Sequence, residues 1–145
     1  MLQRLVARLR PPDVERLFIG PSLRATLVQL AEVLLDAALT ADALALYRLI
    51  LTEASRFPEL AAISDRVGAR DEAVTRIAAL LQHATPAADG ARTRFAAEQF
   101  LNMVIALPQR RALGLGPRMG AAELRAWAHG TVALFLDGYG AGTAG

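Results

Sequence analysis

Apolar side chains recur every three or four positions along most of the chain, and no stretch alternates between apolar and polar residues as a half-buried strand would. Between Ser22 and Leu39 this spacing selects Leu23, Leu27, Leu30, Leu34 and Ala38. Ser22 stands directly before the pattern, where its hydroxyl would cap a helix. The pattern predicts an amphipathic helix, and its repetition predicts an all-α fold, a helical bundle of about five or six helices.

Residues 41–57 follow the same period more strictly, with Thr40 placed to cap the helix. One stripe of this predicted helix is apolar and comprises Ala43, Leu46, Tyr47, Ile50, Ala54 and Phe57. The outward positions are polar and comprise Asp42, Arg48, Thr52 and Arg56. A further helix should follow Pro58, with a break near Gly68. The next apolar stripe comprises Ala73, Val74, Ile77, Leu80, Leu81 and Ala84.

The segment from Ala91 to Leu107 differs because apolar residues occupy most of its circumference, including Phe95, Phe100, Leu101, Met103, Val104 and Ile105. A helix of this kind must be covered on two sides, so it is either central or part of an intermolecular interface. The last predicted helix, from Ala121 to about Asp137, has a bulky stripe of Leu124, Trp127, Leu134 and Phe135. It also has a ridge of small residues, Ala122, Ala126, Gly130 and Ala133.

The length of 145 residues suits one domain. We expect a linking helix and loop over residues 1–20, a core over 22–139 and a mobile tail over 140–145. The start, MLQRLVARLR, has its apolar residues on one helical face, which also suits an organelle presequence. We favour a helix that docks on the body, because the apolar pattern continues directly into the rest of the chain.

Composition removes several classes of protein. With 54% hydrophobic and 21% charged residues the chain is unlike a disordered one, and without cysteine it has no disulfide, thiolate zinc site or cysteine nucleophile. All 16 basic side chains are arginines, but they are scattered among 14 carboxylates rather than gathered on one face as in a nucleic-acid binder. No apolar stretch approaches the roughly eighteen residues of a membrane span.

The polar residues offer little chemistry. His83 and His129 lie far apart, and neither has a carboxylate at metal-ligand spacing, so both are interpreted as surface positions. Glu53 lies at the edge of its predicted helix rather than beside a nucleophile. The glycines of GLGPRMG follow a helix and enclose a proline, which favours a helix–helix connection over a phosphate-binding loop. No catalytic residue, metal site or cofactor is therefore assigned.

Two kinds of aromatic residue have different interpretations. Trp127 and Phe135 fit a core better than a cofactor site. Tyr47 lies on an aliphatic stripe, and its hydroxyl needs a partner if it is buried. Tyr47 therefore either packs in the core or turns its hydroxyl toward an internal cavity, and the sequence leaves both alternatives open.

The stretch ALALYRLILTEASRFPELA resembles a helix pair in the C-terminal domains of TetR-type transcriptional regulators, particularly the AefR-like group. The stretches LRATLVQLAEVLLDAAL, AAEQFLNMVIALPQRRALGLG and LRAWAHGTVALFLDGYG occur in the order that this family shows. The resemblance covers about residues 1 to 140. The individual motifs are helix patterns, and their combined order and spacing make the match specific.

The resemblance implies a domain that dimerises through its last two helices and encloses a pocket for a small, hydrophobic effector. The expected pocket residues are Leu27, Leu30, Leu46, Tyr47, Ile50, Phe57, Ile77, Phe100 and Met103. The expected interface residues are Phe95, Gln99, Asn102, Ala126, Gly130 and Ala133. The bulky stripe of the last helix would then face the core of its own chain, although the two faces could be exchanged.

Such regulators are bacterial, cytoplasmic proteins that bind operator DNA through a separate N-terminal helix-turn-helix domain. Only about twenty residues precede the first matching core helix, too few for three helices, so we expect the sequence to lack that domain and to show no sequence-specific DNA affinity. Whether such a domain was removed, lost or never present is left open.

The leading hypothesis is a domain that binds an effector and dimerises, with no catalysis, no cofactor and no membrane contact. The alternative is a ligand-independent dimerisation module or a remnant of a truncated regulator. A tight dimer whose thermal stability ignores every apolar ligand would favour the alternative. An enzyme ranks third, because the polar residues do not assemble a nucleophile, a base and an orienting group.

Overall fold

The computed structural model describes residues 22–60, 62 and 69–143, and within these ranges it contains helices and no strand. The helices are α2 (Leu23–Ala38), α3 (Ala41–Glu53), α5 (Ala69–Ala84), α6 (Gly90–Ala112) and α7 (Ala121–Thr143). Residues 58–60 are helical as well. The all-α prediction is confirmed. The predicted linking helix over residues 1–20 and the break near Gly68 lie outside the described residues.

Three helices begin at residues whose side chains cap a backbone amide of the first turn. Ser22 Oγ accepts a hydrogen bond from the Ala25 amide and Thr40 Oγ1 accepts one from the Ala43 amide, both at 3.1 Å. Asp89 caps α6 in the same way, since its Oδ1 accepts from the Ala91 amide at 3.2 Å. Each oxygen satisfies one of the backbone amides that have no partner in a first helical turn. Each cap therefore helps to fix the residue at which its helix begins. The predicted caps Ser22 and Thr40 are confirmed.

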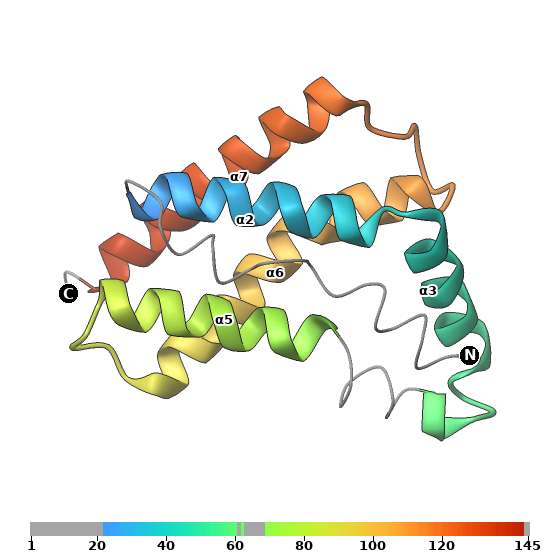
Figure 1. Ribbon diagram of the computed structural model, residues 1–145, viewed down its shortest axis with the longest axis horizontal. Coiled ribbons are helices and arrows are strands. Elements are labelled where there is room, and N and C mark those ends of the chain that lie inside the picture. The colour runs from blue at the N-terminus through green and yellow to red at the C-terminus, as the bar shows by residue number, and fades with distance from the viewer. Residues whose placement is uncertain (1–21, 61, 63–68, 144–145) are drawn as a thin grey trace.

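The helix α6 occupies the centre of the bundle and packs against α2, α5 and α7, while α2 also packs along α7 (Figure 1). The core cluster takes its buried side chains from these four helices, with Leu27, Ile77, Phe100 and Val104 fully inaccessible to solvent. α3 lies at one end of the bundle and contributes nothing to this cluster. The largely apolar segment from Ala91 to Leu107 is therefore a central helix, which was one of the two alternatives that its sequence left open.

An aromatic series joins α6 to the second half of α7. The rings of Phe100 and Phe135 meet edge to face with centroids 5.0 Å apart, and Phe135 stacks on Tyr139 at 5.6 Å. The Arg92 guanidinium lies 5.6 Å from the centroid of the Tyr139 ring. Contacts of this geometry add to the burial of the rings themselves. They hold α7 against α6 as far as Tyr139, and the helix runs on to Thr143, whereas the sequence predicted an end near Asp137.

Two further helix ends differ from the prediction. α3 ends at Glu53 rather than at Phe57, and residues 54–56 form a turn. α6 passes through Pro108 and ends at Ala112, five residues beyond the predicted Leu107. Proline normally stops a helix because it lacks an amide hydrogen and leaves the carbonyl four residues earlier without its donor. Here the Trp127 indole Nε1 donates to that carbonyl, Val104 O, at 2.9 Å.

The C-terminus of α6 closes in a Schellman motif, which explains the glycine-rich connection to α7. The Leu115 amide donates to the Arg110 carbonyl at 3.1 Å, and the Gly114 amide donates to the Arg111 carbonyl at 3.0 Å. Gly114 has φ +97°, a conformation that side chains with a Cβ disfavour. The segment GLGPRMG is thus a helix–helix connection, as predicted.

We expect Gly114→Ala to lower the free energy of unfolding by about 1 kcal/mol, because a Cβ there meets no neighbouring atom but strains the positive φ. Gly120→Ala is the matched control in the same loop, since its Cβ also has open space and its φ is not positive. Urea unfolding monitored by circular dichroism would measure both. Equal effects of the two substitutions would contradict the assigned role of Gly114.

Candidate functional site

Five of the nine expected pocket residues belong to one apolar cluster. Leu27, Ile77 and Phe100 are 0% exposed and Leu30 is 4% exposed, all as members of the core cluster. Met103 packs against this cluster from α6 and is half-buried. The helices α2, α5 and α6 therefore bring these five side chains together.

The four expected pocket residues from α3 and the turn after it lie outside the core cluster. Leu46 is 9% exposed, and Tyr47 and Ile50 are half-buried. Phe57 is 51% exposed, so its placement on the apolar stripe is wrong. The stripe assumed helical rotation up to Phe57, but the helix ends at Glu53 and the turn redirects the ring, which lies beneath the Arg56 guanidinium.

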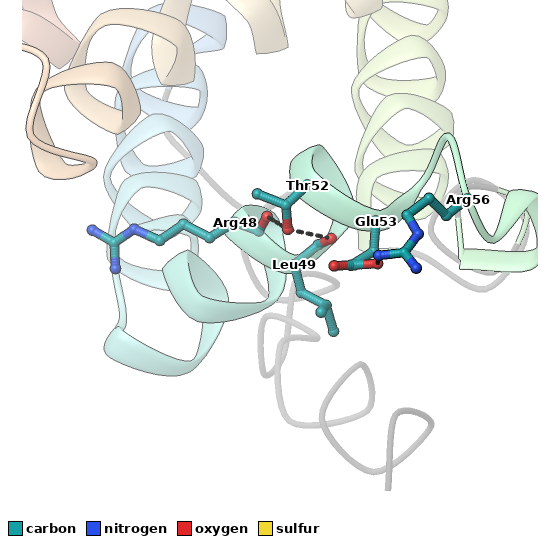
Figure 2. Close-up of polar contacts among 5 residues, drawn as sticks. All are labelled: Arg48, Leu49, Thr52, Glu53 and Arg56. Atoms are coloured by element: carbon teal, nitrogen blue, oxygen red, sulfur yellow. Dashed lines mark hydrogen bonds and ion pairs between the residues drawn. The ribbon is translucent and has the colours of Figure 1, made fainter.

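The polar residues of α3 bond within their own segment (Figure 2). Thr52 Oγ1 donates to the carbonyl oxygens of Arg48 and Leu49, at 2.9 and 3.2 Å. Glu53 pairs with Arg56 at 3.8 Å, in an exposed i, i+3 contact of the kind that contributes little. Figure 2 shows the Arg48 guanidinium pointing away from this pair. The polar residues around Tyr47 thus form a largely solvent-exposed helix face whose hydrogen bonds and ion pair are local.

Both histidines, His83 and His129, have exposed side chains. In the described part of the chain, no three carboxylates or histidines come close enough to hold a metal ion. None of the helices described there is long and apolar enough to cross a membrane.

A surface hollow of about 290 Å³ lies where α2 passes the first turns of α7, and sequence analysis did not anticipate it. Its apolar residues are Leu35, Ala121 and Leu124, and its charged residues are Glu32, Asp36 and Arg125. Glu32 and Asp36 stand one turn apart on α2, where like charges repel weakly, and the positive end of α7 offsets that repulsion. No single segment carries a signal for this hollow, because it arises only when two helices distant in sequence pack together.

The expected interface residues lie mainly on the solvent-facing sides of α6 and α7. Phe95 is 65% exposed, Gln99, Asn102, Ala126 and Gly130 are exposed, and Ala133 is half-buried. Asn102 also serves its own chain, since its Oδ1 accepts a hydrogen bond from Arg70 Nη2 at 3.0 Å.

The bulky stripe of α7 does not face the core as a whole. Phe135 is buried, Leu124 and Trp127 are half-buried, but Leu134 is 67% exposed, so its predicted place in the core is wrong. Consecutive helical residues point about 100° apart, and the core takes the side of Ala128, Val132 and Phe135. Leu134 is left exposed on α7, one turn beyond exposed Gly130.

Comparison with known proteins agrees with this architecture. Residues 25–141 match the family model of the AefR-like transcriptional repressor C-terminal domain. No curated protein matches the sequence. A solved structure from Mesorhizobium loti MAFF303099, of a protein assigned to the TetR family of transcriptional regulators, superposes with a TM-score of 0.73 at 24% identity. The match covers 94% of this chain and 66% of that one, so the chain spans less than two thirds of its structural relative. The chain belongs to the family of AefR-like C-terminal domains of TetR-type transcriptional repressors.

Proposed function

We propose that this domain binds a small hydrophobic effector and dimerises, and that it acts without catalysis in a cytoplasmic bacterial regulator. The match to the repressor C-terminal family over residues 25–141 carries the proposal. An effector that prefers one arrangement of the helices would shift their equilibrium, and the linked DNA-binding part of a regulator would respond to that shift.

The proposed effector site lies between α3 and the core cluster. Among the helices with described bounds, α3 has its main contact with α2 alone. We therefore expect α3 to be the wall of the proposed site that is displaced most easily. Leu46, Tyr47 and Ile50 would form its side of the site, facing Leu30, Phe100 and Met103. Apolar surface with a single hydroxyl selects a ligand by volume and by one polar contact, as small-molecule pockets commonly do.

The proposed dimer surface consists of Phe95 and Gln99 on α6 with Ala126, Gly130 and Leu134 on α7. Phe95 and Leu134 are among the most exposed large apolar side chains of the described residues. An added Cβ on Gly130 would meet no atom of its own chain, so space beside it is open to a partner. Two copies related by a two-fold axis would bury these residues in a four-helix bundle.

A ligand-independent dimerisation module is the second candidate. It is favoured by the closure of the core, where Leu27, Ile77 and Phe100 retain no exposed surface. If these side chains fill their space completely, an effector has nothing to displace at reasonable cost. The first of the following tests distinguishes the two candidates.

We expect an apolar ligand found by thermal-shift screening to raise the Tm by several degrees, because ligand at a hundred times its Kd stabilises the folded state by about 2.7 kcal/mol. Ile50→Trp should abolish the shift by filling the proposed site from half-buried Ile50. Leu51→Trp is the matched control, since Leu51 is the next residue of α3 and is 61% exposed. A shift that survives both substitutions would place the ligand elsewhere, and the absence of any hit would favour the ligand-independent module.

We expect Gly130→Arg to leave a folded monomer, because burying an unpaired charge costs several kcal/mol, on the order of an association energy. The substitution has room within one chain, so folding should be retained. Ala79→Arg is the control, an equal change at an exposed position of α5. Light scattering at micromolar concentration would measure the mass. A monomeric parent chain, or a Gly130→Arg variant that remains dimeric, would contradict the proposed surface.

A further inference from the structure

Pro108 lies inside α6 and leaves one backbone carbonyl without its usual amide donor. Proline has no amide hydrogen, so the Val104 carbonyl lacks the donor that the residue four positions later normally supplies within α6. Val104 and Pro108 are both buried, so water does not readily take the place of the missing donor. A buried carbonyl without a donor would destabilise the helix at this point.

The donor that the carbonyl finds belongs to the next helix. Trp127 Nε1 donates to Val104 O at 2.9 Å, from a residue whose ring is half-buried. The chain contains one tryptophan. An indole nitrogen donates and never accepts, so the pairing with a carbonyl is chemically matched. The proline of one helix thus creates an acceptor that the tryptophan of another helix satisfies.

We propose that Pro108 and Trp127 form a coupled lock that fixes the rotation of α7 against α6. The bond reaches across the two helices and holds Trp127 on the α6 side of α7. The rotation of α7 then follows: Ala128 and Val132 are 0% exposed, while Ala126 and Gly130 face solvent. The lock therefore selects which face of α7 is offered outward. Its effect on self-association rests on the proposed dimer surface, but the lock itself does not.

A second contact near the other end of α7 explains why one hydrogen bond suffices for this role. Tyr139 stacks on Phe135 and lies under the Arg92 guanidinium, three turns beyond Trp127. The contacts of Phe135 with Phe100 and of Tyr139 with Arg92 join α7 to α6 and restrain the distance between the two helices, but they allow the rings to slide. The Trp127–Val104 bond is directional and defines the rotation.

A double-mutant cycle tests the coupling. In Pro108→Ala the new amide can donate to Val104 O, so the carbonyl no longer needs the indole. Trp127→Phe removes the indole N–H and some packing in either background. We expect Trp127→Phe to lower the folding equilibrium constant by about tenfold more with proline at position 108 than in the Pro108→Ala background, as for one buried carbonyl left without a donor. Urea unfolding at one fixed protein concentration would measure the four proteins.

Leu124→Ala provides the matched control, because Leu124 also packs from α7 against the core but is assigned no role at Val104. Leu124→Ala should lower the free energy of unfolding by the same amount in the parent chain and in the Pro108→Ala background. Equal costs of Trp127→Phe in both backgrounds would overturn the lock and leave the ring with a packing role only. If Trp127→Phe unfolds the parent chain, a folded double variant would support the lock, and failure of both to fold would overturn it.

The single indole N–H allows a direct measurement. We expect its proton resonance to exchange slowly with solvent in the parent chain, and rapid exchange would overturn the lock. Sedimentation should show weaker self-association of Trp127→Phe than of Leu124→Ala, with recovery in the double variant. A monomeric parent chain would reject the dimer proposal, while the folding cycle would still decide whether the lock exists.

Discussion

The hydrogen bond from the Trp127 indole to the Val104 carbonyl allows α6 to continue through a proline, and the bundle depends on the length of α6. α2, α5 and α7 all pack on this helix. If α6 ended before Pro108, the turn into α7 would begin more than one helical turn earlier, and the Schellman motif at Arg110 to Leu115 would not form. The connection that returns the chain along α6 is therefore set by one side chain of α7.

Sequence periodicity predicted the helices because each has a local cause. Ser22 and Thr40 cap where their hydroxyls precede an apolar stripe, and the stripes of α2 and α5 lie in or against the core except at their last residues, Ala38 and Ala84. The wrong ends of α6 and α7 share another cause. Pro108 continues a helix because of a residue nineteen positions away, and α7 reaches Thr143 beyond a tyrosine that stacks on its own helix and meets Arg92 of another. Helix ends that depend on tertiary contacts carry no local signal.

The candidate site shows the same division between local and tertiary causes. The apolar period correctly selected Leu27, Leu30 and Ile77 as inward-facing, because an amphipathic helix turns its apolar stripe toward its neighbours. The period also assigned Leu134 to the core. The sequence of one helix does not show how wide a face its neighbours will cover. α2 and α6 leave room for Phe135 but not for the residue beside it, so Leu134 becomes surface. The exposed apolar face of α7 thus follows from the width of its contact.

Three arginines contribute to this arrangement by joining helices. Arg70 and Arg94 bridge α5 to α6 through Asn102 and Asp71, and Arg111 bridges α6 to Glu123 on α7. Each pair is at least partly exposed and contributes little stability alone, but all of them lie between the helices that α6 organises. The polar contacts of α3 shown in Figure 2 stay within its own segment. Among the helices with described bounds, α3 is therefore the one least tied to the α5–α6–α7 unit.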